Sequence, residues 1–123
     1  MAKILLIEDE AGVRLVVRVN LAMAGLQVLE AADGAAGLEM ARDEQPDLIL
    51  LDAVLPKLDG WQVAHELLHD PSTCEIPIVF LSAHVDATTR ERALDLGAIE
   101  YVTKPFDPVA LARKIDEICG RAG

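Results

Sequence analysis

The sequence predicts a doubly wound α/β fold, in which helices cover both faces of a parallel sheet. Five short runs of strand character alternate with five stretches of helical periodicity along the 123 residues, and this alternation is typical of α/β proteins. Three of the runs are continuously apolar, as parallel strands are when helices bury both of their faces. We therefore expect a single domain over residues 1–123, long enough to bury a sizeable core.

The strand-like runs are short, and residues with charged or hydroxyl side chains follow most of them. They span residues 3–7, 27–31, 47–51, 77–81 and 100–102. The continuously apolar runs are the first, third and fourth, with the sequences KILLI, DLILL and PIVFL.

Helical spacing fills the segments between the strands. The apolar positions of the first helix are Val13, Val16, Val17 and Leu21. Gly25 is placed to end this helix, because glycine commonly follows a helix C-terminus. A weaker second helix is expected over residues 34–43, and a third over residues 60–69, where Pro71 stops it.

Capping residues mark the last two helices. Asp86 is suited to cap the fourth helix, residues 86–96, and Gly97 follows its end. Asp107 is suited to cap the fifth, with Pro108 in its first turn. The buried stripe of the fifth helix is predicted to consist of Leu111, Ile115 and Ile118.

The composition limits the classes of function. The net charge is −10, from 11 basic and 21 acidic residues, which disfavours direct binding to nucleic acid or to an anionic membrane surface. It is compatible with a cation site. There is no apolar run of membrane-spanning length and no N-terminal signal peptide. Cys74 and Cys119 lack metal-ligand spacing and are expected to be reduced thiols, so we expect a cytoplasmic protein.

Four of the predicted strands are followed by side chains that can do chemistry. Glu8 and Asp9 follow the first strand, Asp52 the third, Ser82 the fourth and Lys104 the fifth. In open α/β sheets, ligands bind outside the carboxyl ends of the strands. These five residues are therefore expected to meet at one edge of the sheet.

This set of groups predicts phosphoryl transfer to an aspartate. Clustered carboxylates repel one another unless a proton or a cation relieves them, and hard oxygen ligands suit Mg²⁺. Asp52 would act as the nucleophile, and Mg²⁺ on Asp9, Asp52 and a backbone carbonyl would offset the charge of two approaching anions. Lys104 and Ser82 would hold the transferred oxygens.

Four motifs carry this chemistry, namely IEDE, LLDAVLPKLDG, FLSAH and YVTKPF, in that order along the chain. Together they resemble the receiver domain of two-component response regulators, over essentially the whole chain. The resemblance implies a flavodoxin-like sheet with the strand order 2-1-3-4-5. It also implies Mg²⁺ as cofactor and a phosphorylation-activated signalling switch rather than an enzyme.

The resemblance also implies a role for individual residues. Glu8 and Asp9 resemble the acidic pair that binds the metal, Asp52 the phosphoacceptor, and the carbonyl of Val54 the backbone metal ligand. Glu8 replaces the commoner aspartate, which lengthens one arm of the pair. Val54 and His84 occupy the two positions that flank the phosphoryl group and tune its lifetime. Val54 offers no polar group to orient an attacking water, whereas His84 could orient one.

Three further roles concern the switch. Ser82 resembles the switch hydroxyl and Lys104 the lysine that contacts the phosphoryl group. Tyr101 resembles the aromatic residue that turns inward when the hydroxyl engages phosphate. The bond between Lys104 and Pro105 is expected to be cis.

The implied partners are a histidine kinase or phosphotransfer protein as phosphodonor, and a downstream protein that binds the face made by the fourth helix, the fifth strand and the fifth helix. We expect a monomer or a weak phosphorylation-dependent dimer, without direct contact to nucleic acid or membrane. The alternative is a receiver domain that belongs to a longer regulator.

Other functions fit the residues less well. Aspartyl-phosphate phosphatases usually place a second acid two residues after the nucleophile, where this chain has Val54. A flavin-binding electron carrier needs a phosphate loop rich in glycine and hydroxyl groups after the first strand, and EDEAG would repel phosphate. His65 and His69 are four residues apart on a helix and could pair on a metal, but without an evident third ligand an exposed helix face is favoured.

Overall fold

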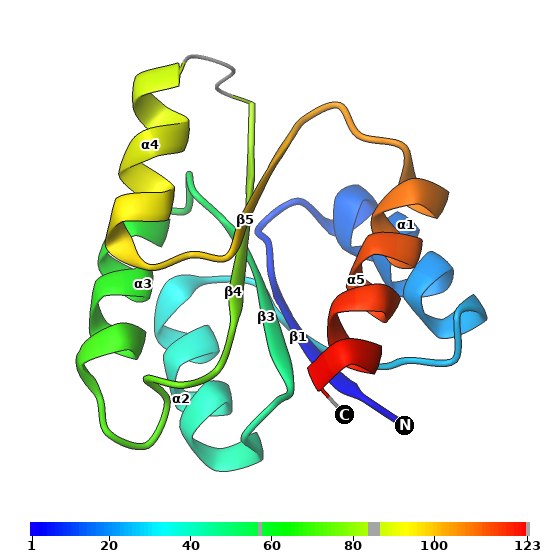
Figure 1. Cartoon of the computed structure of the whole chain (residues 1–123), viewed down its shortest axis with the longest axis horizontal. Helices are drawn as coiled ribbons and strands as arrows, with labels where there is room; N and C mark the ends of the chain where they lie inside the picture. Colours follow the sequence, from blue (N-terminus) through cyan, green and yellow to red (C-terminus); the bar gives the residue numbers. More distant parts are fainter. Residues whose placement is uncertain (57, 84–86, 123) are drawn as a thin grey trace.

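The computed structural model describes residues 1–56, 58–83 and 87–122, with side chains up to residue 120. Strands and helices alternate along this part of the chain (Figure 1). The strands are β1 (Lys3–Ile7), β2 (Gln27–Ala31), β3 (Leu48–Asp52), β4 (Ile78–Ser82) and β5 (Glu100–Thr103). The helices are α1 (Ala11–Met23), α2 (Gly34–Glu44), α3 (Gly60–His69), α4 (Ala87–Leu96) and α5 (Pro108–Ala122).

The five strands form one parallel sheet in the order β2-β1-β3-β4-β5. In Figure 1, α2, α3 and α4 lie on one side of the sheet, and α1 and α5 lie on the other. The predicted doubly wound fold and its strand order are therefore confirmed. The order reverses between β1 and β3, so the carboxyl ends of these two strands flank the crevice where ligands bind in such sheets.

The core consists of two apolar layers, one on each face of the sheet, because successive side chains of a strand point to opposite faces. Along β1, Leu5 and Ile7 belong to the layer under α2, α3 and α4. Ile4 and Leu6 belong to the layer under α1 and α5. The same alternation along β3 and β4 explains why these runs are apolar at nearly every position.

The predicted ends of β3 and β4 are wrong by one residue. Both strands begin one residue later than predicted and continue through the polar residue at their end, so Asp52 and Ser82 are strand residues. The parallel ladder causes this, since Asp52 pairs with Leu81 and Ser82 pairs with Thr103. The carboxyl group of Asp52 and the hydroxyl of Ser82 therefore start from the sheet and not from a loop.

The apolar positions that indicated α1 are only partly buried. Val17 and Leu21 are buried, but Val16 is 44% exposed. Four apolar residues within nine cover more of the helix circumference than the sheet can bury. Gly25 ends the helix with a backbone φ of +87°, a conformation that glycine adopts without strain.

The predicted start of α5 is confirmed, because the Asp107 side chain accepts a hydrogen bond from the Val109 amide at 2.9 Å. Leu111 and Ile115 are buried and Ile118 is partly buried, as predicted. The predicted cap Asp86 and the flanking residue His84 lie outside the described residues.

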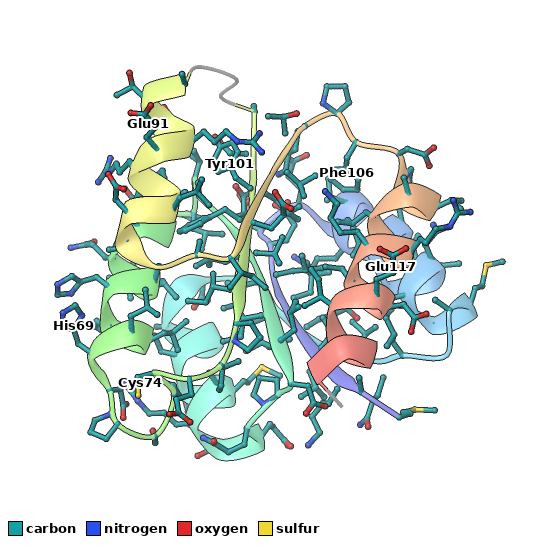
Figure 2. The ribbon with its side chains drawn as sticks, in the orientation of Figure 1. His69, Cys74, Glu91, Tyr101, Phe106 and Glu117 are labelled. Atoms are coloured by element: carbon teal, nitrogen blue, oxygen red, sulfur yellow. The ribbon has the colours of Figure 1, made fainter. Side chains whose placement is uncertain are left out.

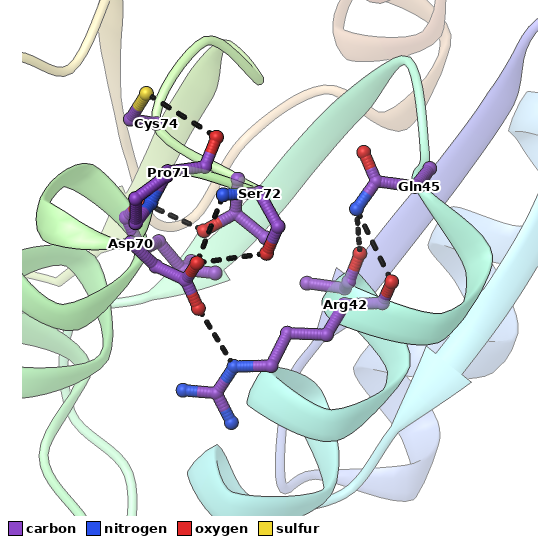
Figure 3. A network of polar contacts seen from close by, with 9 residues as sticks. Arg42, Gln45, Asp70, Pro71, Ser72 and Cys74 are labelled. Carbon is purple, nitrogen blue, oxygen red and sulfur yellow. Dashed lines mark hydrogen bonds and ion pairs between the residues drawn. The ribbon is translucent and has the colours of Figure 1, made fainter.

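Polar contacts tie α2 to the loop after α3, at the end of the sheet opposite the carboxyl ends of the strands (Figure 3). The Arg42 Nε donates to the Asp70 carboxylate at 2.9 Å, and the same carboxylate accepts from the Ser72 amide at 2.9 Å. These donors hold the pKa of Asp70 low, at about 2, with the Ser72 amide contributing most. None of the described helices is both long and apolar enough to span a bilayer.

Candidate functional site

The predicted site residues meet at the carboxyl edge of the sheet. Glu8 and Asp9 follow β1, Asp52 ends β3, Ser82 ends β4 and Lys104 follows β5. Glu8 and Ser82 have no exposed surface and Asp52 is 4% exposed, whereas Asp9 is open to solvent. The site therefore consists of three buried residues, Glu8, Asp52 and Ser82, and one exposed carboxylate, Asp9.

The carboxylates of Glu8, Asp9 and Asp52 converge. One oxygen from each lies within 4.8 Å of the other two. Among the described residues, no other three acidic, histidine or cysteine side chains come together in this way. Opposite ligands of Mg²⁺ are about 4 Å apart, since each Mg²⁺–oxygen distance is about 2.1 Å. The donor set and its spacing therefore fit a magnesium ion.

Lys104 supplies positive charge inside this cluster. Its Nζ donates to the Glu8 carboxylate at 2.6 Å and to the Asp52 carboxylate at 3.0 Å. The lysine thus bridges two carboxylates that come from different strands, and it offsets part of their repulsion.

Protonation equilibria are shifted in this cluster. The pKa of Glu8 is raised to about 7, mostly by burial and further by contact with Asp52, against the opposing effect of Lys104. Burial lowers the pKa of Lys104, but the hydrogen bonds to Glu8 and Asp52 outweigh it, so the net pKa is raised. At neutral pH the lysine is therefore charged, and Glu8 takes up or releases a proton.

Two backbone features position Asp52. The Val54 amide donates to the Asp52 Oδ1 at 3.0 Å, which orients the carboxylate. Gly60 packs against the backbone of β3, and a Cβ there would collide with the Asp52 carbonyl oxygen and lie 2.8 Å from the Ala53 Cα. The start of α3 can thus approach the end of β3 only because residue 60 has no side chain.

The predicted switch residues lie on β4 and β5. The Ser82 carbonyl accepts a hydrogen bond from the Lys104 amide at 2.7 Å. Tyr101 is 3% exposed and lies in the apolar layer under α4 (Figure 2). Its side chain is therefore already inward. The peptide bond between Lys104 and Pro105 is cis.

Arg14 is a neighbour of the site that the sequence motifs did not indicate. Its guanidinium donates to the carbonyls of Glu8 at 2.8 Å and Asp9 at 3.1 Å, and so fixes the backbone that carries the acidic pair. The sequence holds no signal for this role, because the acceptors are backbone carbonyls. His65 and His69 are exposed and stack on each other, with ring centroids 4.1 Å apart.

Comparisons with known proteins agree with this geometry. The family model of the response regulator receiver domain matches residues 4–116. A probable transcriptional regulator ycf27 of Porphyridium aerugineum is 40% identical over 97% of this chain and 48% of its own length. The DNA-binding dual master transcriptional regulator RpaA of Synechocystis is 39% identical over 98% of this chain and 50% of its own. The chain thus spans about half the length of these relatives.

A solved structure of similar fold carries a metal. It is the receiver domain of the sensor histidine kinase PA1611 from Pseudomonas aeruginosa, with a magnesium ion coordinated in its active-site cleft. It is 32% identical, covers 97% of this chain and 98% of its own, and has a TM-score of 0.87. With the fold, the acidic cluster and the matching family model in agreement, the chain belongs to the response regulator receiver domain family.

Proposed function

We propose that this chain is a phosphorylation-dependent signalling switch in which Asp52 accepts the phosphoryl group. The observation that carries the proposal is the convergence of three carboxylates with the Lys104 ammonium group at one end of the sheet. Structural ion pairs also form such contacts, but here a third carboxylate, open to solvent, converges with the two that Lys104 contacts. It suits a site that takes up a cation and an anion.

Glu8, Asp9, Asp52 and the Val54 carbonyl would hold Mg²⁺. When bound, the ion would offset the negative charge of the carboxylates and of the incoming phosphoryl group. Asp9 is the exposed member and gives access from solvent. Glu8 has to be ionised to act as an acceptor for metal-bound water or for the metal itself, so its proton is released on binding.

In the transfer step, an oxygen of Asp52 forms a bond to phosphorus while the bond from phosphorus to the donor nitrogen breaks. The donor is a phosphohistidine of a histidine kinase or phosphotransfer protein, and its imidazole leaves. The Val54 amide holds the Asp52 Oδ1. The Oδ2, which accepts from Lys104 in this structure, would react once the lysine turns to the phosphoryl group. The ammonium group of Lys104 and the hydroxyl of Ser82 bind the transferred oxygens.

The output is a change in the face made by α4, β5 and α5. Engagement of the Ser82 hydroxyl by phosphate would favour one arrangement of this face, in which Tyr101 keeps the inward position that it already has. A separate protein reads the face, or an attached domain does so in a longer regulator. An attached domain is favoured, because relatives of about twice this length are named transcriptional regulators. With a net charge of −10, nucleic acid contact falls to such a domain rather than to these residues.

The test is chemical labelling of the purified chain. Incubation with Mg²⁺ and acetyl phosphate should add one phosphoryl group, measured by intact mass, and the group should be lost in hydroxylamine. Asp52→Asn should abolish labelling, whereas Asp116→Asn, which removes an exposed carboxylate from α5, should not. Undiminished labelling of Asp52→Asn, or labelling that persists in chelator, would overturn the assignment.

A further inference from the structure

Helix α4 is weakly attached to the rest of the fold. All of its residues, 87–96, are described, and Ala93 alone among them is fully buried. Leu96 packs partly against the core, while Leu94 is exposed. The ion pair from Arg90 to Glu100, at 3.7 Å, lies in solvent. A helix with so little apolar burial opens more readily than its neighbours.

A cation–π contact links α4 to α3. The Arg92 guanidinium lies over the Trp61 ring, 4.3 Å from the ring centroid. The two side chains line a groove of about 690 Å³ between the helices, together with Gln62, His65, Thr88, Glu91, Asp95 and Leu96. A guanidinium over an indole face is attracted by the ring quadrupole, so this stack ties the two helices across the groove.

Trp61 is also linked to the phosphoacceptor. It directly follows Gly60, which packs on the Asp52 carbonyl. Its indole contacts the Phe80 ring of β4, with centroids 4.7 Å apart. Phe80 in turn pairs with Leu51, next to Asp52, and with Tyr101. The tryptophan therefore touches β4, which carries Ser82 and pairs with β3, the strand that carries Asp52.

We propose that the stack of Arg92 on Trp61 is a latch, which holds α4 against α3 while Asp52 is unphosphorylated and releases it when Asp52 is phosphorylated. This inference rests on the proposed function and adds to it the contact between α4 and α3 that phosphorylation breaks. The latch is an exposed contact of modest strength, and a switch requires such a contact because a strong one would not yield to a single phosphoryl group.

Trp61 is the only tryptophan of the chain, so its emission reports on the latch directly. In the wild type, Mg²⁺ and acetyl phosphate should shift the emission in proportion to the phosphorylated fraction measured by intact mass. Arg92→Gln should show most of this shift without phosphate, and little further change when phosphorylated. Arg90→Gln is the matched control, because it removes an arginine of the same helix that pairs with Glu100 instead.

Hydrogen exchange separates a released helix from a merely altered tryptophan environment. Arg92→Gln should raise the exchange rates of α4 amides about two- to fivefold, the factor that corresponds to an exposed cation–π contact. Phosphorylation of the wild type should do the same, and Arg90→Gln should not, with α3 unchanged throughout. If phosphate is incorporated but Trp61 emission and α4 exchange stay constant, the latch is wrong while the proposed function stands. If phosphate is not incorporated, the proposed function itself fails.

Discussion

Glu8 is a glutamate without exposed surface that contacts both Asp52 and Lys104, so its ionisation alters the free energy of unfolding. Its pKa is about 7 in the folded chain, raised first by burial and then by Asp52, against an ordinary value of 4.5. Below about pH 4.5 it is protonated in both states, and the folded state keeps its full stability. Between about pH 4.5 and pH 7 the unfolded chain has released this proton and the folded chain still holds it, so stability falls over this range and the contribution of Glu8 is fully lost once the pH has risen through 7.

The first prediction concerns Glu8→Gln in the presence of chelator. Wild-type stability should fall by an amount on the order of 3 kcal/mol between pH 4.5 and pH 8 relative to the variant, as the shifted pKa requires. Urea denaturation at a series of pH values measures this difference. Parallel curves for the two proteins would show that Glu8 ionises as freely in the fold as in water.

Lys104 is predicted to serve the phosphoryl group more than the metal. Lys104→Ala should bind Mg²⁺ as tightly as the wild type or more tightly, because a nearby cation is removed, but it should be phosphorylated more slowly. Calorimetry well above pH 7, where Glu8 is ionised, gives the affinity. Lys3→Ala is the control, since Lys3 pairs with Glu44 away from the site. A large loss of Mg²⁺ affinity in Lys104→Ala alone would contradict the assignment.

The places of Glu8, Asp9, Asp52 and Ser82 could be predicted because they stand at the ends of apolar runs, and that of Lys104 because it follows the fifth predicted strand. The burial of each side chain could not be predicted. The sequence indicates an acidic pair at Glu8 and Asp9, but only the fold buries the first and exposes the second. Arg14 could not be assigned either, since its partners are backbone carbonyls, which have no identity in the sequence.

At the scale of elements, the start of α3 decides where Asp52 points. Gly60→Ala should lower stability by roughly 1–3 kcal/mol, because the new methyl group meets backbone that has no room to move. It should also slow phosphorylation, since Asp52 is displaced. In contrast, Gly12→Ala should raise stability by roughly 0.5–1 kcal/mol, because Gly12 lies in α1 with nothing within 4 Å of the added atom.

Urea denaturation and phosphorylation rates test this pair of variants. Equal effects of the two substitutions would mean that the close approach of α3 to β3 has no role in holding Asp52. A loss of stability in Gly60→Ala without a change in the phosphorylation rate would limit the role of the approach to folding.

The strands that helices cover on both faces were predicted well, but the residues at which they begin and end were predicted less well. The apolar runs predicted β1, β3 and β4, because only covered strands tolerate such sequences. Their ends could not be read from hydrophobicity, since the ladder carries Asp52 and Ser82 into the strands. The spacing of Val16, Val17 and Leu21 indicated the helix α1, yet which of these residues are buried depends on how α1 packs on the sheet, and spacing does not determine that.

At the scale of the whole molecule, the acidic cluster is expected to reduce the stability of the metal-free fold. Above pH 7, in chelator, the free energy of unfolding of Asp52→Asn should exceed that of the wild type by about 1–2 kcal/mol, because one of the converging charges is gone. The variant should therefore melt at a higher temperature. Millimolar Mg²⁺ should raise the wild-type midpoint more than that of the variant, since it binds the folded state at these carboxylates. Below pH 7 the gap should shrink as Glu8 takes up a proton.

Thermal melts with chelator and with Mg²⁺, above and below pH 7, test these statements together, with Asp116→Asn as the control. If Asp52→Asn melts clearly below the wild type without metal, the carboxylates do not repel one another in the fold, and the magnesium site loses its physical basis.

The bond from Lys104 to Glu8 joins positions 96 apart in the chain, and this separation has a consequence during synthesis. A ribosome delivers Glu8, Asp9 and Asp52 well before Lys104. The three carboxylates therefore exist for a time without their counter-charge. The strand that brings the lysine lies at the edge of the sheet, beside β4 alone, so it can be added last without threading. A nascent chain, or one cut before residue 104, thus cannot assemble the site, and its chemistry begins only when the fifth strand has been made.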